Sequence, residues 1–280
     1  MNSQRLYFTQ LPYEVLAASN TLRELARPGD KIIARKPHIG FHSQVELVPF
    51  PFTKTLPDLG RYAREKHARW IYFSWLEAEL RPEYVYLLDT TAIVPGLRVR
   101  HATYGHPSVL YEIGPELGIE PAWMRNDTLV AIHQIHAELL IHPDNTDALY
   151  RLATIERLRG NYDLAFQLID HATQLRPNEA RLWLLLGDIR LRLNDPASAD
   201  AAFVRTLTLD PSNAEAQIGR GWASLYANRP RDAAALWRPV VGAAQDPITL
   251  QQMIRVYGQL GDTEGEAAAR AALARIMGSR

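Results

Sequence analysis

The sequence predicts a small α/β domain followed by an all-α solenoid of repeated helical hairpins. The main observation is that residues 146–177 align with residues 180–211 without a gap, at a constant offset of 34 residues. The chain before residue 119 lacks this repeat and instead mixes short β-branched runs with helical patterns. A 34-residue period is typical of two antiparallel helices, which must stack on neighbouring units because one unit cannot bury its apolar face alone.

Length and composition limit the possible classes of function. The 280 residues allow one or two domains. Since 31 basic residues balance 31 acidic ones, bulk charge predicts no nucleic-acid binding. The chain has no cysteine, which excludes disulfides and thiolate metal sites. No uncharged apolar run approaches about 18 residues, so we expect no membrane insertion of this chain. The first residues contain no readable signal peptide, which predicts a cytoplasmic protein if the chain is complete as written.

The first domain is expected to span residues 1–118, with the order α-β-β-α-β-α-β-β. Turn signals and prolines separate its elements, and the composition changes around residues 114–121. Apolar spacing predicts helices, and short apolar runs predict strands that pack against them in a layered sheet. The predicted helices are 12–26, 58–68 and 82–89, and the predicted strands are 31–41, 45–51, 69–75, 97–103 and 108–114.

The solenoid is expected to span residues 119–280. A capping helix over 126–142 precedes four repeats, at about 146–179, 180–213, 214–247 and 248–278. Small residues at aligned positions, among them Gly187 and Gly221, predict close approach of the two helices of a unit. The aligned pairs 160–161, 194–195, 228–229 and 261–262 each begin with Gly or Asn, which predicts the turn between the helices.

This pattern resembles the tetratricopeptide-repeat family. The resemblance implies that the first helix of each unit lines a concave groove that binds a protein or peptide. Aromatic and arginine side chains are frequent anchors in interfaces. The lining departs from the carboxylate clamp of chaperone-binding members, which requires Lys and Asn at fixed groove positions. For Tyr150 and Trp222 an alternative stays open, in which they pack between adjacent units. The candidate groove residues are Tyr150, Thr154, Arg157, Leu184, Asp188, Arg192, Ile218, Trp222, Tyr226 and Val256.

A second candidate site lies at the end of the first predicted strand. Arg35, Lys36 and His38 stand together there, and open α/β sheets usually place ligands at strand ends. A guanidinium beside an ammonium group could hold a phosphate or a carboxylate. The alternative is a solvated strand end that Pro37 terminates.

The first domain also resembles the soluble region after the last membrane helix in bacterial family-39-type glycosyltransferases. The segments that carry the resemblance are PGDKIIARKPH, VPFP, RWIYFSWLEAELRPEYVYLLDTT and LRVRHATYGHPSVLYEIG. The family's membrane helices and catalytic acid have no counterpart here. The resemblance therefore implies an accessory domain or fragment associated with such a membrane enzyme, on the extracytoplasmic face.

The residues predict no catalytic centre, no cofactor and no metal site. His133 and His136 lie three positions apart on a predicted helix, but no acidic partner stands at a familiar offset. Phosphate loops, nucleophile elbows and paired carboxylates are absent from the sequence. We therefore expect a scaffold that binds a protein through its repeat groove. The alternative is a ligand-binding α/β domain that contacts a sugar phosphate or lipid-linked sugar as part of a glycosyltransferase.

Overall fold

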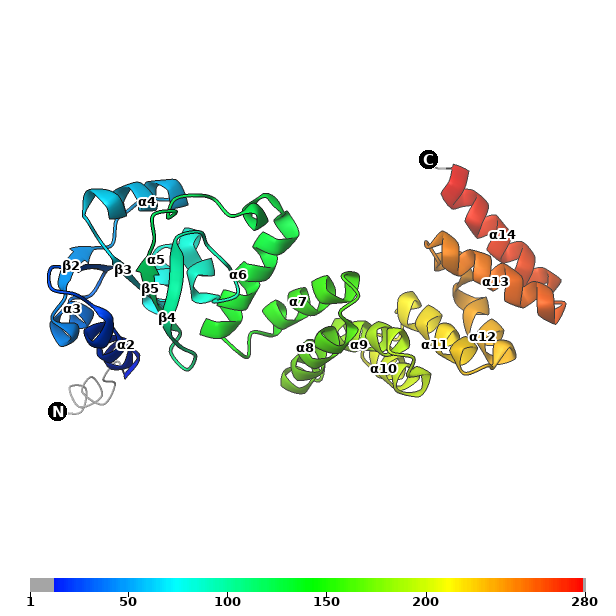
Figure 1. Cartoon of the computed structure of the whole chain (residues 1–280). Coiled ribbons are helices and arrows are strands. Elements are labelled where there is room, and N and C mark those ends of the chain that lie inside the picture. The colour runs from blue at the N-terminus through cyan, green and yellow to red at the C-terminus, as the bar shows by residue number, and fades with distance from the viewer. Residues whose placement is uncertain (1–12, 279–280) are drawn as a thin grey trace, which may run out of the picture. The chain divides into compact units, whose positions relative to one another are not determined.

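The chain divides into two compact units, Met1–Asn145 and Thr146–Arg280, in a computed structural model that describes residues 13–278. Figure 1 shows a sheet with surrounding helices in the first unit and antiparallel helix pairs in the second. No helix among residues 13–278 combines the length and apolarity needed to cross a membrane.

The first unit confirms the predicted α/β class. Its elements run from a helix packed on the sheet to the long helix α6 that closes the unit. They are α2 (Tyr13–Leu25), β1 (Lys31–Ala34), α3 (His38–Ser43), β2 (Glu46–Pro49), α4 (Leu56–Glu65), β3 (Trp70–Ser74), α5 (Trp75–Leu80), the 3-10 helix η1 (Pro82–Leu88), β4 (Leu97–Thr103), β5 (Ser108–Ile113), the 3-10 helix η2 (Ala122–Arg125) and α6 (Asp127–Ile141).

The five strands form one mixed sheet in the order β2-β1-β3-β5-β4. The strand β1 pairs in parallel with β2 and β3, whereas β5 pairs antiparallel with β3 and β4. Side chains along a strand alternate between its faces. Ile32 and Trp70 therefore pack with α2 on one face, while Ile33 and Ile71 pack with α4 and η1 on the other. The central strand β3 is buried along its whole length, as its apolar run predicts.

Two predicted elements of the first unit differ from the structure. The strand predicted over 31–41 ends at Ala34, because Pro37 follows and precedes the short helix α3. Pro37 cannot donate to a strand ladder, but its carbonyl accepts a hydrogen bond from the Phe41 amide at 2.8 Å. The residues directly after β3 form the helix α5, which the sequence did not predict.

The helix predicted over 126–142 is present as α6, and it packs on the core of the first unit. Its N-cap Asn126 accepts a hydrogen bond from the Leu129 amide, which fixes where the helix begins. Ala137 is fully buried in the core of the first unit, and Leu140 and Ile141 pack against that core. Because α6 packs there, the compact first unit extends to Asn145, while the domain boundary near residue 118 stays a prediction.

The second unit consists of four consecutive helical hairpins. The first two match the predicted repeats closely, and the third has an interrupted second helix. The helices are α7 (Thr146–Leu158), α8 (Tyr162–Leu175), α9 (Ala180–Arg192), α10 (Pro196–Leu209), α11 (Ala214–Tyr226), α12 (Pro230–Trp237) with the 3-10 helix η3 (Arg238–Ala243), α13 (Pro247–Leu260) and α14 (Thr263–Gly278). Pro239 explains the interruption, because proline inside an α-helix lacks the donor and clashes with the preceding turn.

Glycines in the first helices make room for an aromatic ring on a second helix, either of the same hairpin or of the preceding one. A Cβ atom on Gly187 or on Gly219 would come within 2.5 Å of the Phe203 ring. A Cβ atom on Gly221 would lie 2.0 Å from Nε1 of Trp237. Both rings are buried. The close approach of helices that the small residues predict is present, and at these places an aromatic ring packs directly against the glycine backbone.

The four hairpin turns share one backbone conformation. Gly160, Asn194, Asn228 and Gly261 all have φ between 56° and 82°, in the left-handed region that ends many helices. This conformation lets the chain reverse into the second helix. It explains why only Gly and Asn, the residues that adopt it most readily, stand at this place in the repeat.

Candidate functional site

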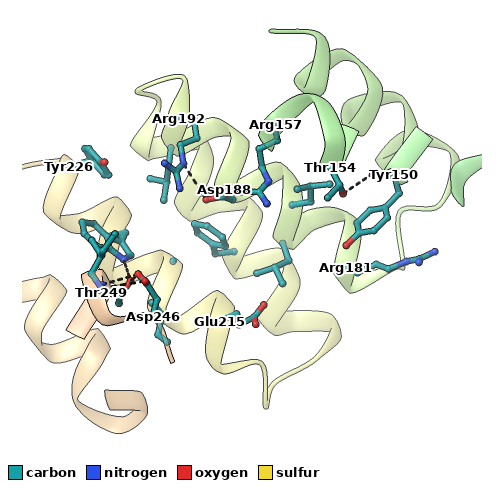
Figure 2. Close-up of a pocket in the computed structure, with 18 residues that line it drawn as sticks. Tyr150, Thr154, Arg157, Arg181, Asp188, Arg192, Glu215, Tyr226, Asp246 and Thr249 are labelled. Atoms are coloured by element: carbon teal, nitrogen blue, oxygen red, sulfur yellow. Dashed lines mark hydrogen bonds and ion pairs between the residues drawn. The ribbon is translucent and has the colours of Figure 1, made fainter. Parts of the chain in front are cut away.

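The second unit, which holds the repeats, contains an open groove of about 540 Å³. It is lined mainly by α7, α9, α11 and the beginning of α13. Figure 2 shows its lining side chains, most of which come from the first helices of the hairpins. Nine of the ten predicted groove residues line this groove. They are Tyr150, Thr154, Arg157, Leu184, Asp188, Arg192, Ile218, Trp222 and Tyr226. These nine residues share one groove, and their role in binding a partner stays a prediction.

Val256, the tenth predicted residue, does not line the groove. It is buried with the core of the last two hairpins, beside Leu250, Met253 and Tyr257. The predicted groove position was carried over from the other repeats. In the fourth hairpin α13 turns that position inward, so the correct groove residues there are Ile248 and Thr249 at the start of the helix.

A cluster of charges occupies the α7–α9 part of the groove. Arg157 Nη1 lies 2.8 Å from Asp188 Oδ2, and Arg192 Nε lies 3.7 Å from Asp188 Oδ1. Figure 2 shows the carboxylate between the two guanidinium groups. One acidic group thus faces two permanent cations, which leaves one positive charge in excess. Arg157 Nε is buried and has no hydrogen-bond partner among residues 13–278.

Tyr150 lies near this cluster but has a different partner. The guanidinium carbon of Arg181 lies 4.8 Å from the centre of the Tyr150 ring, a cation–π contact between α7 and α9. Arg181 is also ion-paired with Asp147 on α7. Tyr150 therefore takes part in packing between adjacent repeats while also lining the groove.

The α11–α13 part of the groove is aromatic. The rings of Trp222 and Tyr226 lie 6.0 Å apart, and Trp222 also meets the buried Trp237 edge-on at 5.8 Å. Trp222 Nε1 donates a hydrogen bond to the Thr249 hydroxyl at 3.3 Å. The open alternative for Trp222 is thus resolved in favour of both roles: one part of the side chain packs between repeats, and the residue also faces the groove.

Two acidic residues complete this part of the lining, Glu215 on α11 and Asp246 before α13. Asp246 caps α13 by accepting hydrogen bonds from the amides of Ile248 and Thr249. Burial raises the pKa of Asp246, but the hydrogen bonds from Thr249 and Ile248 outweigh it and bring the pKa below its usual value. Asp246 is therefore ionised at neutral pH. The groove is polarised, with excess positive charge near α9 and negative charge near α13.

The sequence did not predict the groove-lining residues that lie outside the first helices. Phe203 lies on α10 and reaches the groove because Gly219 has no side chain to cover its ring. Asp246 belongs to the connection before α13. The repeat alignment could have indicated Phe203 through its glycine neighbours, but no sequence signal indicates Asp246 as a lining residue.

The second predicted site, Arg35, Lys36 and His38, is exposed at the carboxyl end of β1. Arg35 and Lys36 lie close enough to the buried carboxyl of Glu77 to influence its pKa, although burial is the larger effect and raises that pKa. Glu77 itself pairs with the buried Arg81 at 2.9 Å. That Arg35, Lys36 and His38 together hold an anion stays a prediction.

Comparisons with known proteins agree with the repeat geometry. A family model described as "Tetratricopeptide repeat" matches residues 122–180 and 184–247. The protein CTR9 homolog of Arabidopsis thaliana is 39% identical over 87 residues, which are 31% of this chain and 8% of that protein. Cellulose synthase operon protein C of Pseudomonas fluorescens is 34% identical over 91 residues, 32% of this chain and 7% of that protein.

Solved structures of similar shape include MamA of Desulfovibrio magneticus, residues 41 to the end. It shares 16% sequence identity with a TM-score of 0.48, and the match covers 56% of this chain and 89% of that one. The matched segments span less than a tenth of the two curated relatives named above. The 34-residue period, the glycine-seated rings and the family match together identify the C-terminal unit as an array of tetratricopeptide repeats.

Proposed function

We propose that this protein is a non-catalytic scaffold whose second unit binds a segment of a partner protein in its groove. The observation that carries the proposal is the charge excess at Arg157, Asp188 and Arg192. One carboxylate neutralises one guanidinium, and the second cation is available to an incoming acidic group. A carboxylate is the natural complement because a guanidinium can donate two parallel hydrogen bonds to it.

The rest of the groove defines the other features of the partner. The half-exposed Trp222 and the exposed Tyr226 and Ile248 provide an apolar surface for an aliphatic or aromatic side chain. Glu215 and Asp246 lie beside that surface and favour a basic group on the partner. The groove therefore suits a segment with an acidic residue, an apolar anchor and a basic residue in that order. Recognition of this kind places a peptide along a concave surface with anchors at intervals.

A peptide-display experiment with the full chain as bait tests this proposal. We expect enrichment of sequences that combine an acidic residue with an apolar anchor. A variant with Arg157→Glu, Arg192→Glu and Trp222→Ala should bind an enriched peptide at least about tenfold more weakly, because it removes both kinds of anchor. Arg270→Glu is a matched control, since Arg270 is an exposed arginine on α14 outside the groove.

Two results of this experiment would count against the proposal. Equal binding by the triple variant and the control would contradict the proposal. Enrichment of purely basic peptides would contradict the assigned role of Arg157 and Arg192, because like charges would then face each other. Circular dichroism of each variant establishes that the helical array is intact before binding is compared.

We further propose that the scaffold works beside a glycosyltransferase of the extracytoplasmic face. The support is the resemblance of the first domain to the soluble region of family-39-type enzymes, and the α/β layer expected from it. The match to a cellulose synthase operon protein fits the same context. Cross-linking in the native cell followed by mass spectrometry tests this link. Recovery of the groove cross-linked only to proteins unrelated to glycosyl transfer would refute it.

A further inference from the structure

In the first unit, Asp89 meets two histidines that lie 44 and 47 residues further along the sequence. Asp89 follows η1, and His133 and His136 lie one turn apart on α6. His133 Nδ1 lies 2.8 Å and His136 Nδ1 3.1 Å from the same oxygen, Oδ2 of Asp89. One potential ligand atom from each residue lies within 4.8 Å of the other two.

The cluster is held in place from several sides. The second oxygen of Asp89 accepts hydrogen bonds from the amide of Thr91 at 2.9 Å and from its hydroxyl at 2.6 Å. The His133 ring meets Trp123 edge-on at 4.6 Å, and Trp123 is anchored through its Nε1 to the carbonyl of Ile93. Asp89 and His133 are therefore oriented in advance, in the way that outer partners orient the ligands of metal ions.

The buried Asp89 carboxyl group has only histidines as ion-pair partners within the described residues. The Asp89 side chain is only 5% exposed, and within residues 13–278 its only ion-pair partners are the two histidines. Buried charges in proteins are usually paired with a permanent charge or coordinate a metal. Within residues 13–278, no lysine or arginine pairs with the Asp89 carboxyl group.

We propose that Asp89, His133 and His136 form a binding site for a divalent transition-metal ion of the Zn²⁺ class. Two imidazole nitrogens and one carboxylate oxygen are the donors that such ions prefer, whereas Mg²⁺ and Ca²⁺ prefer oxygen alone. The ion would lie between the two Nδ1 atoms and Oδ2 of Asp89, in place of the hydrogen bonds that join them. The His136 side chain is 32% exposed, so an ion can enter and solvent can occupy a fourth position.

The sequence reading expected no metal at these histidines because no acidic residue stands at a familiar offset. The structure provides that residue from a position 44 residues earlier than His133. A bound ion would tie the end of η1 to α6, and so attach the last helix of the first unit to its core.

Metal binding by the purified full chain tests the proposal. After treatment with a chelator and dialysis, calorimetric titration with Zn²⁺ should show one ion per chain. His136→Gln should weaken the affinity at least about tenfold, since it removes a ligand. Substitution with Co²⁺ should give a visible absorption spectrum in the original protein that His136→Gln lacks. His142→Ala is the matched control, because His142 is an exposed histidine at the end of the same helix.

Asp89→Asn is the more direct change, but loss of a buried carboxylate could unfold the unit. His136→Gln keeps the pair of Asp89 with His133 and is therefore the deciding variant. Failure of the original protein to bind Zn²⁺ stoichiometrically would overturn the proposal. Equal affinity in the original protein and His136→Gln would also overturn it, since the ion would then be bound elsewhere.

Discussion

Replacement of Gly221 by alanine tests the packing rule that organises the repeats. The new Cβ atom would lie 2.0 Å from Nε1 of Trp237, far closer than any ordinary contact. The ring cannot move freely, because it is fully buried and Nε1 donates a hydrogen bond to the Ile218 carbonyl at 2.9 Å. Trp222 blocks another side of the ring. The substitution therefore forces either the ring or α11 to shift.

The expected cost follows from three contributions. Overpacking of a filled core costs about 1–3 kcal/mol. Loss of the hydrogen bond to Ile218 adds about 1 kcal/mol. The better helix propensity of alanine returns about 1 kcal/mol. We therefore expect Gly221→Ala to lower the free energy of unfolding by about 1–3 kcal/mol.

Gly258→Ala provides a matched control of opposite sign. Gly258 lies inside α13, and the nearest atom to an added Cβ is the end of the flexible Glu266 side chain at 3.4 Å. Alanine there should raise stability by up to about 1 kcal/mol, because only the propensity changes.

Thermal unfolding of the full chain, followed by circular dichroism, measures both variants. We expect Gly221→Ala to lower the midpoint by about 3 °C or more and Gly258→Ala to leave it unchanged or higher. If Gly221→Ala is as stable as Gly258→Ala, the ring does not depend on the missing side chain and the reasoning fails.

Three further predictions concern a turn, a buried ion pair and acid stability. Asn228 has φ 56°, so Asn228→Val should lower the free energy of unfolding by about 1–2 kcal/mol, whereas Asn228→Gly should not lower it; urea titration distinguishes the two. Arg81→Met should cost about 3–5 kcal/mol, because it leaves the buried carboxylate of Glu77 without its partner; a loss below about 1 kcal/mol would contradict this. Hydrogen bonds from Arg69 and a second arginine lower the pKa of Glu112, so its ionised form stabilises the fold above the usual glutamate pKa. That stabilisation should be lost as the pH falls through the lowered pKa, and Glu112→Gln should show a smaller loss between pH 5 and 3 in thermal midpoints.

Part of the groove lining can be predicted from the repeat alignment. Alignment of one unit on the next predicts which positions of each first helix face the same side, and this held for three hairpins. It failed at Val256, because α13 begins 33 rather than 34 residues after α11, so this position is shifted and buried in the core. The pairing of Arg157 with Asp188 could not be predicted either, since it joins side chains of two different repeats.

The sequence by itself determined the helical repeats, their turns and the strands of the first domain. These features depend on local rules: a period of 34 residues, a left-handed residue at each turn, and apolar runs long enough for a strand. Only the tertiary structure decided that α6 belongs to the first unit and that Asp89 meets His133 and His136. The physical reason is that such contacts depend on which surfaces remain to be buried once the elements have formed. No spacing along the chain records that choice.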